Sequence, residues 1–112
     1  DTAIFRGTGV NAPDTVTRAQ AAARFKRLWA IYDYAIAEEY RFLPGVDPNT
    51  LKPDGSVRGY FPYEVIKPAT DSTERASAKV WVYESFDFNE DGKIVYAQVY
   101  SDMASAYRLL AE

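Results

Sequence analysis

Residues 78–88, AKVWVYESFDF, alternate between two kinds of side chain along their whole length. The even-numbered positions are aliphatic or aromatic except for Glu84, whereas the odd-numbered positions are Lys, Trp, Tyr, Ser and Asp. A period of two is typical of a β-strand that turns one face toward the interior of a protein. The pattern therefore predicts a strand whose buried face carries one carboxylate.

The position of Glu84 makes it the first candidate for a functional residue. An ionisable group on an apolar face costs several kcal/mol unless it is paired, hydrogen-bonded or protonated. Proteins accept that cost mainly at functional sites, although buried carboxylates paired with arginine also occur. Two interpretations stay open: a functional acid, or a structural Glu84 that is paired or lies at the rim of the sheet.

The composition excludes several classes of function. The chain has 112 residues, which predicts a single domain over residues 1–112 with a core of its own. A net charge of −3 without a run of Lys or Arg argues against a nucleic-acid partner. No apolar run approaches the roughly 18 residues of a membrane span, so we expect no membrane partner and a cytoplasmic location.

The absence of Cys and His limits the chemistry of any site. It excludes disulfides, thiolate catalysis, Cys-based zinc sites, Ser-His-Asp machinery and His-ligated metals. We expect no metal and no cofactor, and any acid–base chemistry must come from Asp, Glu, Lys or Tyr. Nine Tyr and two Trp exceed what packing alone requires, which indicates a ligand pocket or a subunit interface.

The first part of the chain predicts a short strand, a loop and a helix. Residues 1–8 are typical of a strand that ends in a glycine turn, and residues 11–14 are typical of a loop. Thr17 with Gln20 three residues later is a capping box. Because apolar side chains then follow at helical spacing, we predict a helix over 17–30.

The middle of the chain predicts strands joined by a long loop. Residues 32–43 alternate as a strand does but also fit a continued helix, and we favour the strand. Repeated proline and glycine predict a loop over 44–59. The strand predicted over 59–67 contains Pro62, which cannot donate a ladder hydrogen bond and therefore indicates a sheet edge or a bulge.

The turn at 89–92 predicts a hairpin between the alternating strand and a last strand over 93–103. A four-residue turn pairs Phe88 with Lys93, and both strands then place aliphatic side chains on one side. The other side is too aromatic for bare solvent and too polar for a core, which predicts an interface and a homodimer. The residues of this predicted interface are Trp81, Tyr83, Tyr96 and Tyr100.

Residues 76–110 resemble the closing hairpin of the nuclear transport factor 2-like superfamily, which includes SnoaL-type polyketide cyclases and ketosteroid isomerases. The resembling stretches are VWVYESFDF at 80–88, DGKI at 91–94 and YSDM at 100–103. The start of the chain resembles the family's first strand, and the predicted helix fits its third helix. The resemblance implies an α+β fold in which a strongly curved antiparallel sheet wraps around a helix as a cone-shaped barrel with a pocket inside.

The resemblance also implies a role for Glu84. In the ketosteroid isomerases an acid at the corresponding strand position donates a hydrogen bond to the substrate oxyanion, which suits a protonated carboxyl in an apolar site. The general base of those isomerases falls at or beside Arg6, which cannot accept a proton. Family members also begin with two helices that close the pocket, and about thirty to forty such residues are absent here. Three explanations stay open: a truncated start, a partner chain that covers the open end, or an unused site.

We therefore predict a small-molecule-binding domain with a mostly apolar pocket for a molecule that carries a carbonyl. Whether isomerase, cyclase or dehydratase catalysis occurs is left open. The predicted catalytic residues are Glu84, as proton donor or base, and Tyr63, as its hydrogen-bond partner. The predicted ligand-binding residues are Arg6, Trp29, Phe61, Val82, Phe86 and Val99. The alternative function is a non-catalytic association module that uses the predicted aromatic interface.

Overall fold

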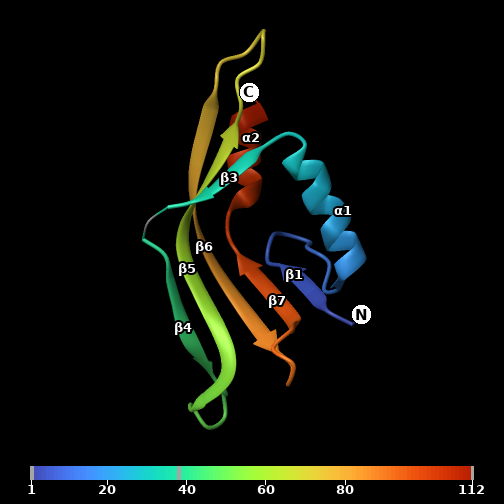
Figure 1. The fold of residues 1–112 in the computed structure, drawn as a ribbon, viewed down its shortest axis with the longest axis vertical. Helices are drawn as coiled ribbons and strands as arrows, with labels where there is room; N and C mark the ends of the chain where they lie inside the picture. The colour runs from blue at the N-terminus through green and yellow to red at the C-terminus, as the bar shows by residue number, and fades with distance from the viewer. Residues whose placement is uncertain (1, 38, 112) are drawn as a thin grey trace.

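The computed structural model describes residues 2–37 and 39–111, which form an α+β fold with one mixed sheet and two helices (Figure 1). The elements follow one another as β1 (Ile4–Gly7), β2 (Val16–Thr17), α1 (Arg18–Trp29), β3 (Asp33–Ile36), β4 (Arg41–Val46), β5 (Pro53–Lys67), β6 (Ala76–Phe88), β7 (Ile94–Tyr100) and α2 (Met103–Ala111).

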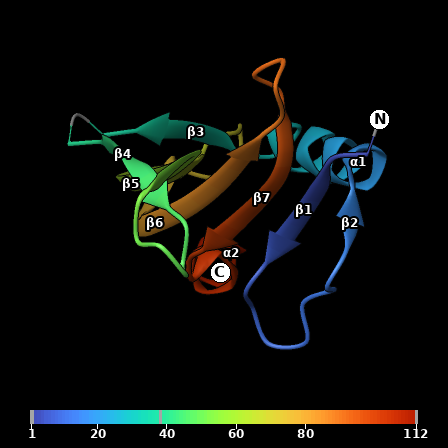
Figure 2. The same cartoon turned by 90° about the horizontal axis from the view of Figure 1, so that it is seen from below.

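The seven strands form one sheet in the order β2-β1-β7-β6-β5-β3, and β4 also pairs with β5. Every pairing is antiparallel except that of β1 with β7, which is parallel. The sheet is therefore mixed, whereas the family resemblance implied an antiparallel sheet. Figure 2 shows the strands following an arc from β3 to β2. Because β2 and β3 do not pair with each other within the described residues, the sheet is open rather than a closed barrel.

The long hairpin of β5 and β6 gives the molecule its elongated shape (Figure 1). Fifteen residues of extended chain in β5 reach about 50 Å, and the molecule measures 54 × 30 × 27 Å. Its radius of gyration is 15.9 Å, whereas a compact domain of this length has about 13 Å. Large parts of both sheet faces therefore lie outside any compact core.

The core lies where α2 packs on β5 and β6. Val65 and Ala78 of the sheet meet Ala106 and Leu110 of the helix, and all four are buried. The partly buried side chains that pack against this core are Tyr32, Tyr34, Met103 and Tyr107. By contrast, α1 contacts mainly β1 and β2, and Ala21 is its one buried residue.

The helix predicted over 17–30 is confirmed as α1. The Thr17 hydroxyl accepts a hydrogen bond from the Gln20 backbone, and the Gln20 side chain accepts one from the Thr17 backbone, which completes the capping box. The strand favoured over 32–43 is confirmed in part: the chain is extended rather than helical, but it forms two strands, β3 and β4, instead of one. Residue 38, between them, lies outside the described residues.

The loop predicted over 44–59 is wrong for most of its length. β4 continues to Val46 and β5 begins at Pro53, so the connection is a short turn over residues 47–52. The Asp47 carboxylate stabilises this turn by accepting hydrogen bonds from the backbone of Asn49 and Thr50. Strand pairing therefore overrides the turn propensity of proline and glycine on both sides of it.

The prediction that Pro62 marks a sheet edge is also wrong, because β5 pairs with β6 along one side and with β3 and β4 along the other. Pro62 lies at the junction between the pairing with β4, which ends at Tyr60, and the pairing with β3, which begins at Tyr63. Its carbonyl accepts a hydrogen bond from Ala37 at 3.0 Å. The backbone N–H that proline lacks thus falls between the part of β5 that pairs with β4 and the part that pairs with β3.

The hairpin of β6 and β7 forms in a different register from the predicted one. Glu84 lies opposite Val99 rather than Ala97, and the register shifts again between Asp87 and Phe88. A shift of two residues changes the cross-strand partners but leaves every side chain on its predicted face. The expected division into an apolar and an aromatic face therefore survives the error.

The last strand, predicted over 93–103, ends at Tyr100, and residues 103–111 form α2. This helix was not predicted, although its sequence carries the signal. The inward-facing residues Met103, Ala106, Tyr107 and Leu110 follow the i, i+3, i+4, i+7 spacing of an amphipathic helix. Asp102 precedes them, and its carboxylate accepts a hydrogen bond from the Ser105 backbone at 3.4 Å.

A candidate ligand-binding face around Glu84

Three neighbouring strands place the predicted apolar residues on one face of the sheet. In β6, Glu84 lies opposite Gly59 of β5 and Val99 of β7. Residues opposite each other in a sheet point to the same side, and every second residue along a strand does so too. The side chains that share this surface, which we call the Glu84 face, are Phe61, Tyr63, Val82, Glu84, Phe86 and Val99.

Gly59 brings an aromatic ring of β4 close to this face. A Cβ atom at Gly59 would lie 3.2 Å from Cε1 of Phe42 and 3.5 Å from Cε1 of Phe61. The absence of a side chain therefore leaves room for both rings beside Glu84. The sequence does not predict Phe42 as a site residue, because it predicts a loop over 44–59 and therefore no strand partner for β4.

The carboxyl group of Glu84 is half-buried, and burial raises its pKa. No described Lys or Arg lies within ion-pair distance of it, and no described residue donates a hydrogen bond to it. No fully buried polar side-chain atom among the described residues lacks a partner, so the Glu84 oxygens remain in contact with water. The alternative that Glu84 is one half of a buried ion pair is therefore not supported among the described residues.

Tyr63 lies on the same face as Glu84, and burial as well as the charge of Glu84 contributes to the raised pKa of the Tyr63 phenol. Burial is the main cause that raises the pKa of its phenol, followed by the nearby Tyr107 and Glu84. The ring of Tyr63 stacks on Tyr34 at 5.4 Å and meets Phe61 edge-on at 5.9 Å. The structure therefore places both residues on one face of the sheet, where Tyr63 lies opposite Val80, four residues before Glu84 in β6, and no hydrogen bond joins the two side chains.

A pair of phenols extends this cluster toward α2. The hydroxyl groups of Tyr34 and Tyr107 are 2.8 Å apart and share a hydrogen bond. Burial, together with that hydrogen bond, raises the pKa of Tyr34 far above the ordinary tyrosine value. At neutral pH the Tyr34 phenol is therefore protonated and acts as a neutral hydrogen-bonding group.

Two predicted site residues lie elsewhere. Arg6 is paired in register with Gln98, which places it on the opposite face of the sheet, and its guanidinium lies 3.5 Å from the carboxylate of Asp14. Trp29 lies at the end of α1, is 63% exposed and stacks on Phe25 at 5.8 Å. The structure therefore does not bring either side chain to Glu84.

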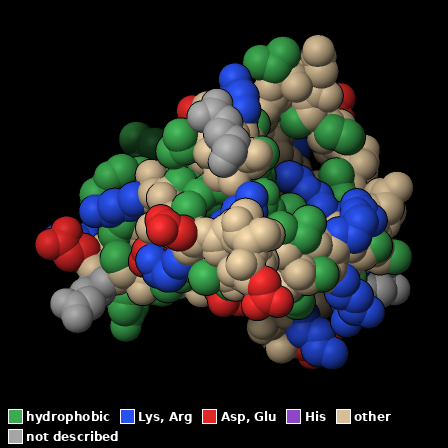
Figure 3. All heavy atoms as spheres, turned by 90° about the horizontal axis from the view of Figure 1, so that it is seen from above, with side chains coloured by type: hydrophobic (Ala, Val, Ile, Leu, Met, Phe, Trp, Pro, Cys, Tyr) green, Lys and Arg blue, Asp and Glu red, His purple; other side chains and the backbone are tan. Residues whose placement is uncertain are grey.

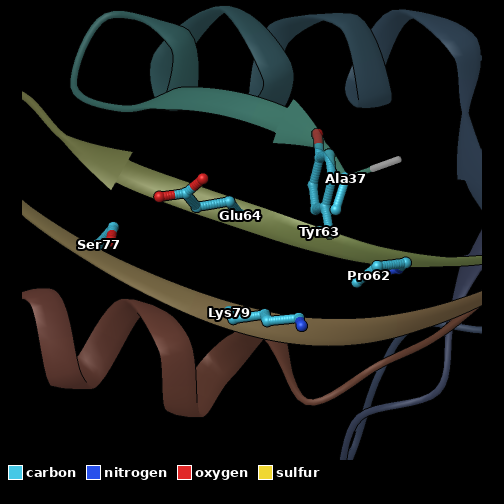
Figure 4. Close-up of a pocket in the computed structure, with 6 residues that line it drawn as sticks. All are labelled: Ala37, Pro62, Tyr63, Glu64, Ser77 and Lys79. Carbon is cyan, nitrogen blue, oxygen red and sulfur yellow. The ribbon is translucent and has the colours of Figure 1, made fainter. Parts of the chain in front are cut away.

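Two surface hollows formed by described residues lie away from Glu84. One, of about 230 Å³, is lined by Ala37, Pro62, Tyr63, Glu64, Ser77 and Lys79 (Figure 4). Another, of about 190 Å³, lies between β6 and α2. Since Glu84 lines neither hollow and Phe42 beside it is 54% exposed, the Glu84 face is a partly open surface.

The opposite face carries an aromatic row, which we call the Tyr83 face: Tyr60, Trp81, Tyr83, Tyr96 and Tyr100. The Tyr83 ring lies 4.8 Å from that of Tyr60 and 5.1 Å from that of Tyr100. The guanidinium of Arg58 donates a hydrogen bond to the Tyr83 hydroxyl at 2.9 Å. Trp81 is 61% exposed, so the row reaches solvent at its end.

Charge is distributed unevenly over the surface. All four charged side chains of α1 are basic: Arg18, Arg24, Lys26 and Arg27. Figure 3 shows basic side chains gathered on the side of the molecule where α1 lies. Across residues 2–37 and 39–111, no three carboxylates cluster closely enough to hold a metal ion. No described helix is long and apolar enough to cross a membrane.

Comparison of the chain with protein-family models, with curated proteins and with solved structures finds no match.

Proposed function

We propose that the Glu84 face binds a small, mostly apolar molecule that carries a carbonyl or hydroxyl group. The observation that carries this proposal is the half-buried carboxyl of Glu84, whose pKa is raised by burial and which has no described partner. A raised pKa favours the neutral acid, which donates a hydrogen bond to a carbonyl oxygen. The phenol of Tyr63 supplies a second neutral donor.

A protonated Glu84 on an apolar face suits the polarisation of a bound carbonyl group, and the Tyr63 phenol lies further along the same face. Isomerase, cyclase or dehydratase chemistry additionally needs a base that removes a proton. The raised pKa of Tyr63 disfavours its phenolate, and Arg6 cannot accept a proton. The proposed function is accordingly ligand binding, with Glu84 as the group that acts on a bound carbonyl.

The proposal includes the fold type, a cone-shaped curved sheet like that of the nuclear transport factor 2-like superfamily, which stays open between β2 and β3. The α+β class and the arc of strands in Figure 2 support it. In such a cone the Glu84 face is the inner surface. The packing of Ala106 and Leu110 on Val65, which lies on the same face as Tyr63, is consistent with a helix inside the curve.

The proposal is tested with two ligands that differ only at the polar group, acetylnaphthalene and ethylnaphthalene. Calorimetry should find that the wild-type protein and the Glu84→Gln variant bind the ketone more tightly, because both side chains can donate a hydrogen bond. Glu84→Leu should lose this preference, which corresponds to about five- to tenfold in affinity for one hydrogen bond.

The Glu84→Leu variant also serves as its own control, because it should keep its affinity for ethylnaphthalene. Equal loss of the ketone in the Gln and Leu variants would mean that Glu84 only shapes the surface. Failure of the wild-type protein to bind either naphthalene would remove the basis for a ligand site on this face.

The Tyr83 face supports a second candidate function, association of two copies of the chain. The specific observation is the exposed aromatic row that ends at Trp81, since monomeric proteins rarely leave such rows uncovered. Charged residues are depleted at the centre of protein interfaces, and Arg58 is already engaged by the Tyr83 hydroxyl. We propose a two-fold homodimer through Trp81, Tyr83, Tyr96 and Tyr100.

A further inference from the structure

The strand β6 extends well beyond its partner β7. Their pairing ends where Tyr83 lies opposite Tyr100, yet β6 begins seven residues earlier, at Ala76. On the other side, β5 pairs with β6 all the way to Ala76. Between residues 76 and 82, β6 therefore has a strand partner on one side only among the described residues.

Two hydrogen bonds identify which backbone groups face this open edge. The carbonyl of Trp81 accepts a hydrogen bond from the hydroxyl of Ser101, just after β7, so Trp81 faces the β7 side. Pro62, which lies opposite Trp81, directs its carbonyl to Ala37 and thus away from β6. In an antiparallel ladder the N–H and C=O of one residue point to the same side, and the direction alternates along the strand.

It follows that Lys79 and Ser77 direct both their N–H and their C=O groups to the open edge. No described residue forms a backbone hydrogen bond to these outward-facing groups. An edge of this kind is a template for the addition of another strand. Figure 4 shows Ser77 and Lys79 on β6, with α2 on the side away from β5.

A hollow of about 190 Å³ lies beside these groups. Val80, Ala106 and Leu109 give it an apolar wall, and Leu109 is 60% exposed. The side chain of an added strand that points to the Glu84 face would enter this hollow, because opposite residues share a face. Side chains on either side of it would point to the Tyr83 face, beside Lys79.

We propose that the β6 edge, Ser77–Val80, binds an extended segment of another polypeptide as an added antiparallel strand. The segment carries an apolar side chain for the hollow, flanked by acidic side chains that complement the Lys79 ammonium. That ammonium lies over the Trp81 ring at 5.4 Å and forms no ion pair with a described residue. Backbone hydrogen bonds supply the affinity of such a contact, and the alternating side chains supply its selectivity.

A second copy of the chain is disfavoured as the occupant. A two-fold pairing of β6 edges centred on Lys79 places Lys79 opposite Lys79, and one centred on Ala78 places the two Lys79 side chains diagonally on the same face. Like charges directly opposite each other destabilise a strand pair, and an edge lysine commonly prevents such self-pairing. An acidic segment from a different polypeptide meets the same edge with the opposite charge.

The probe is a fluorescein-labelled peptide, Thr-Glu-Leu-Glu-Thr, with capped ends, and its binding is followed by fluorescence anisotropy. In the proposed register the glutamate N–H groups face β6, whereas the leucine N–H faces away. Methylation of both glutamate nitrogens should therefore weaken binding by about tenfold or more, since it removes two hydrogen bonds. Methylation of the leucine nitrogen is the matched control and should leave binding unchanged.

Two protein variants test the other side of the contact. Lys79→Pro removes an edge-facing N–H without touching the ladder to β5, and Lys79→Glu reverses the charge; each should weaken binding by about tenfold. Lys93→Glu changes the net charge equally at the exposed β6–β7 turn and should bind as the wild-type protein does. Circular dichroism of each variant checks that the sheet is intact.

Three outcomes would overturn the proposal. One is equal binding of the peptides methylated at glutamate and at leucine, which would show that backbone pairing is not used. Another is the absence of binding at millimolar peptide. The third is a wild-type dimer that Lys79→Pro dissociates in sedimentation, which would make a second copy the occupant of the edge.

Discussion

At the scale of single residues, Glu84 links the stability of the protein to pH. Burial raises its pKa above the ordinary value of 4.5, so the folded protein holds this proton more tightly than the unfolded chain does. Between the two pKa values unfolding releases a proton. The free energy of unfolding therefore decreases as the pH rises through that window, and the contribution of the neutral acid is fully present only below it.

We predict that Glu84→Gln removes this part of the pH dependence. Urea unfolding of both proteins between about pH 4 and pH 7 should find that the wild-type protein loses stability relative to the variant as the pH rises. The comparison cancels other groups, including Asp54, whose pKa is lowered by its hydrogen bonds to Ser56. A constant difference between the two curves would contradict a raised pKa for Glu84.

The alternation of side chains was enough to predict which residues share a face with Glu84. Phe61 and Val82 lie on that face and are buried. Their face could be predicted because the alternation of side chains along a strand does not depend on which residues of the neighbouring strand lie opposite. Phe88 is 39% exposed, since the register shift next to Asp87 carries the end of β6 away from the core. Arg6 was assigned to the site on the resemblance alone, and only the pairing of β1 with β7 shows which way it faces.

At the scale of elements, the contact between β4 and β5 depends on a glycine. A Cβ atom at Gly45 would overlap the side chain of Ser56, which is held in place by its hydrogen bond to the Asp54 carboxylate at 2.6 Å. A substitution at this position therefore forces the two strands apart or displaces Ser56 from its partner.

We predict that Gly45→Ala destabilises the protein by about 1–3 kcal/mol, the range for a group forced into a filled space. Thermal unfolding measures the effect. Gly9→Ala is the matched control, because no atom lies within 4 Å of the Cβ position there. Adding Ser56→Gly to Gly45→Ala should recover part of the loss, and a double variant no more stable than the additive sum would argue against this overlap.

Elements whose evidence is local were predicted, and those that depend on distant partners were not. The capping box of Thr17 and Gln20 lies within four residues, so α1 was correct. The proline and glycine residues between 44 and 59 are typical of turns, and the pairing of β4 with β5 that keeps this segment extended cannot be read from the local sequence. The missed helix α2 differs, because its apolar spacing is present in the local sequence, but no element was predicted after the last strand, which was placed at 93–103.

At the scale of the whole molecule, the elongated hairpin leaves both sheet faces partly uncovered. The radius of gyration of 15.9 Å and the exposed aromatic side chains on the Tyr83 face describe a molecule with more surface than a compact domain. Such a shape favours contacts with other molecules, and the two faces differ in what they offer. The Glu84 face offers one acid among apolar side chains, whereas the Tyr83 face offers aromatic rings.

We predict that the Tyr83 face mediates a homodimer at tens of micromolar protein. Trp81→Lys combined with Tyr96→Lys should give a monomer in sedimentation, because charges at the centre of an interface are unfavourable. Trp29→Lys is a control that removes an equally exposed Trp from α1 and should leave the dimer intact. A wild-type monomer at this concentration would rule out the second candidate function.

The central claim is that a neutral Glu84 donates a hydrogen bond to a bound carbonyl, and one titration tests it most directly. The carboxyl carbon of Glu84, labelled with carbon-13, is followed by NMR against pH with and without saturating acetylnaphthalene. Because the ligand prefers the protonated acid, its binding should raise the pKa of Glu84 beyond the value that burial alone produces. A titration curve that the ketone leaves in place, or moves to lower pH, would contradict the claim.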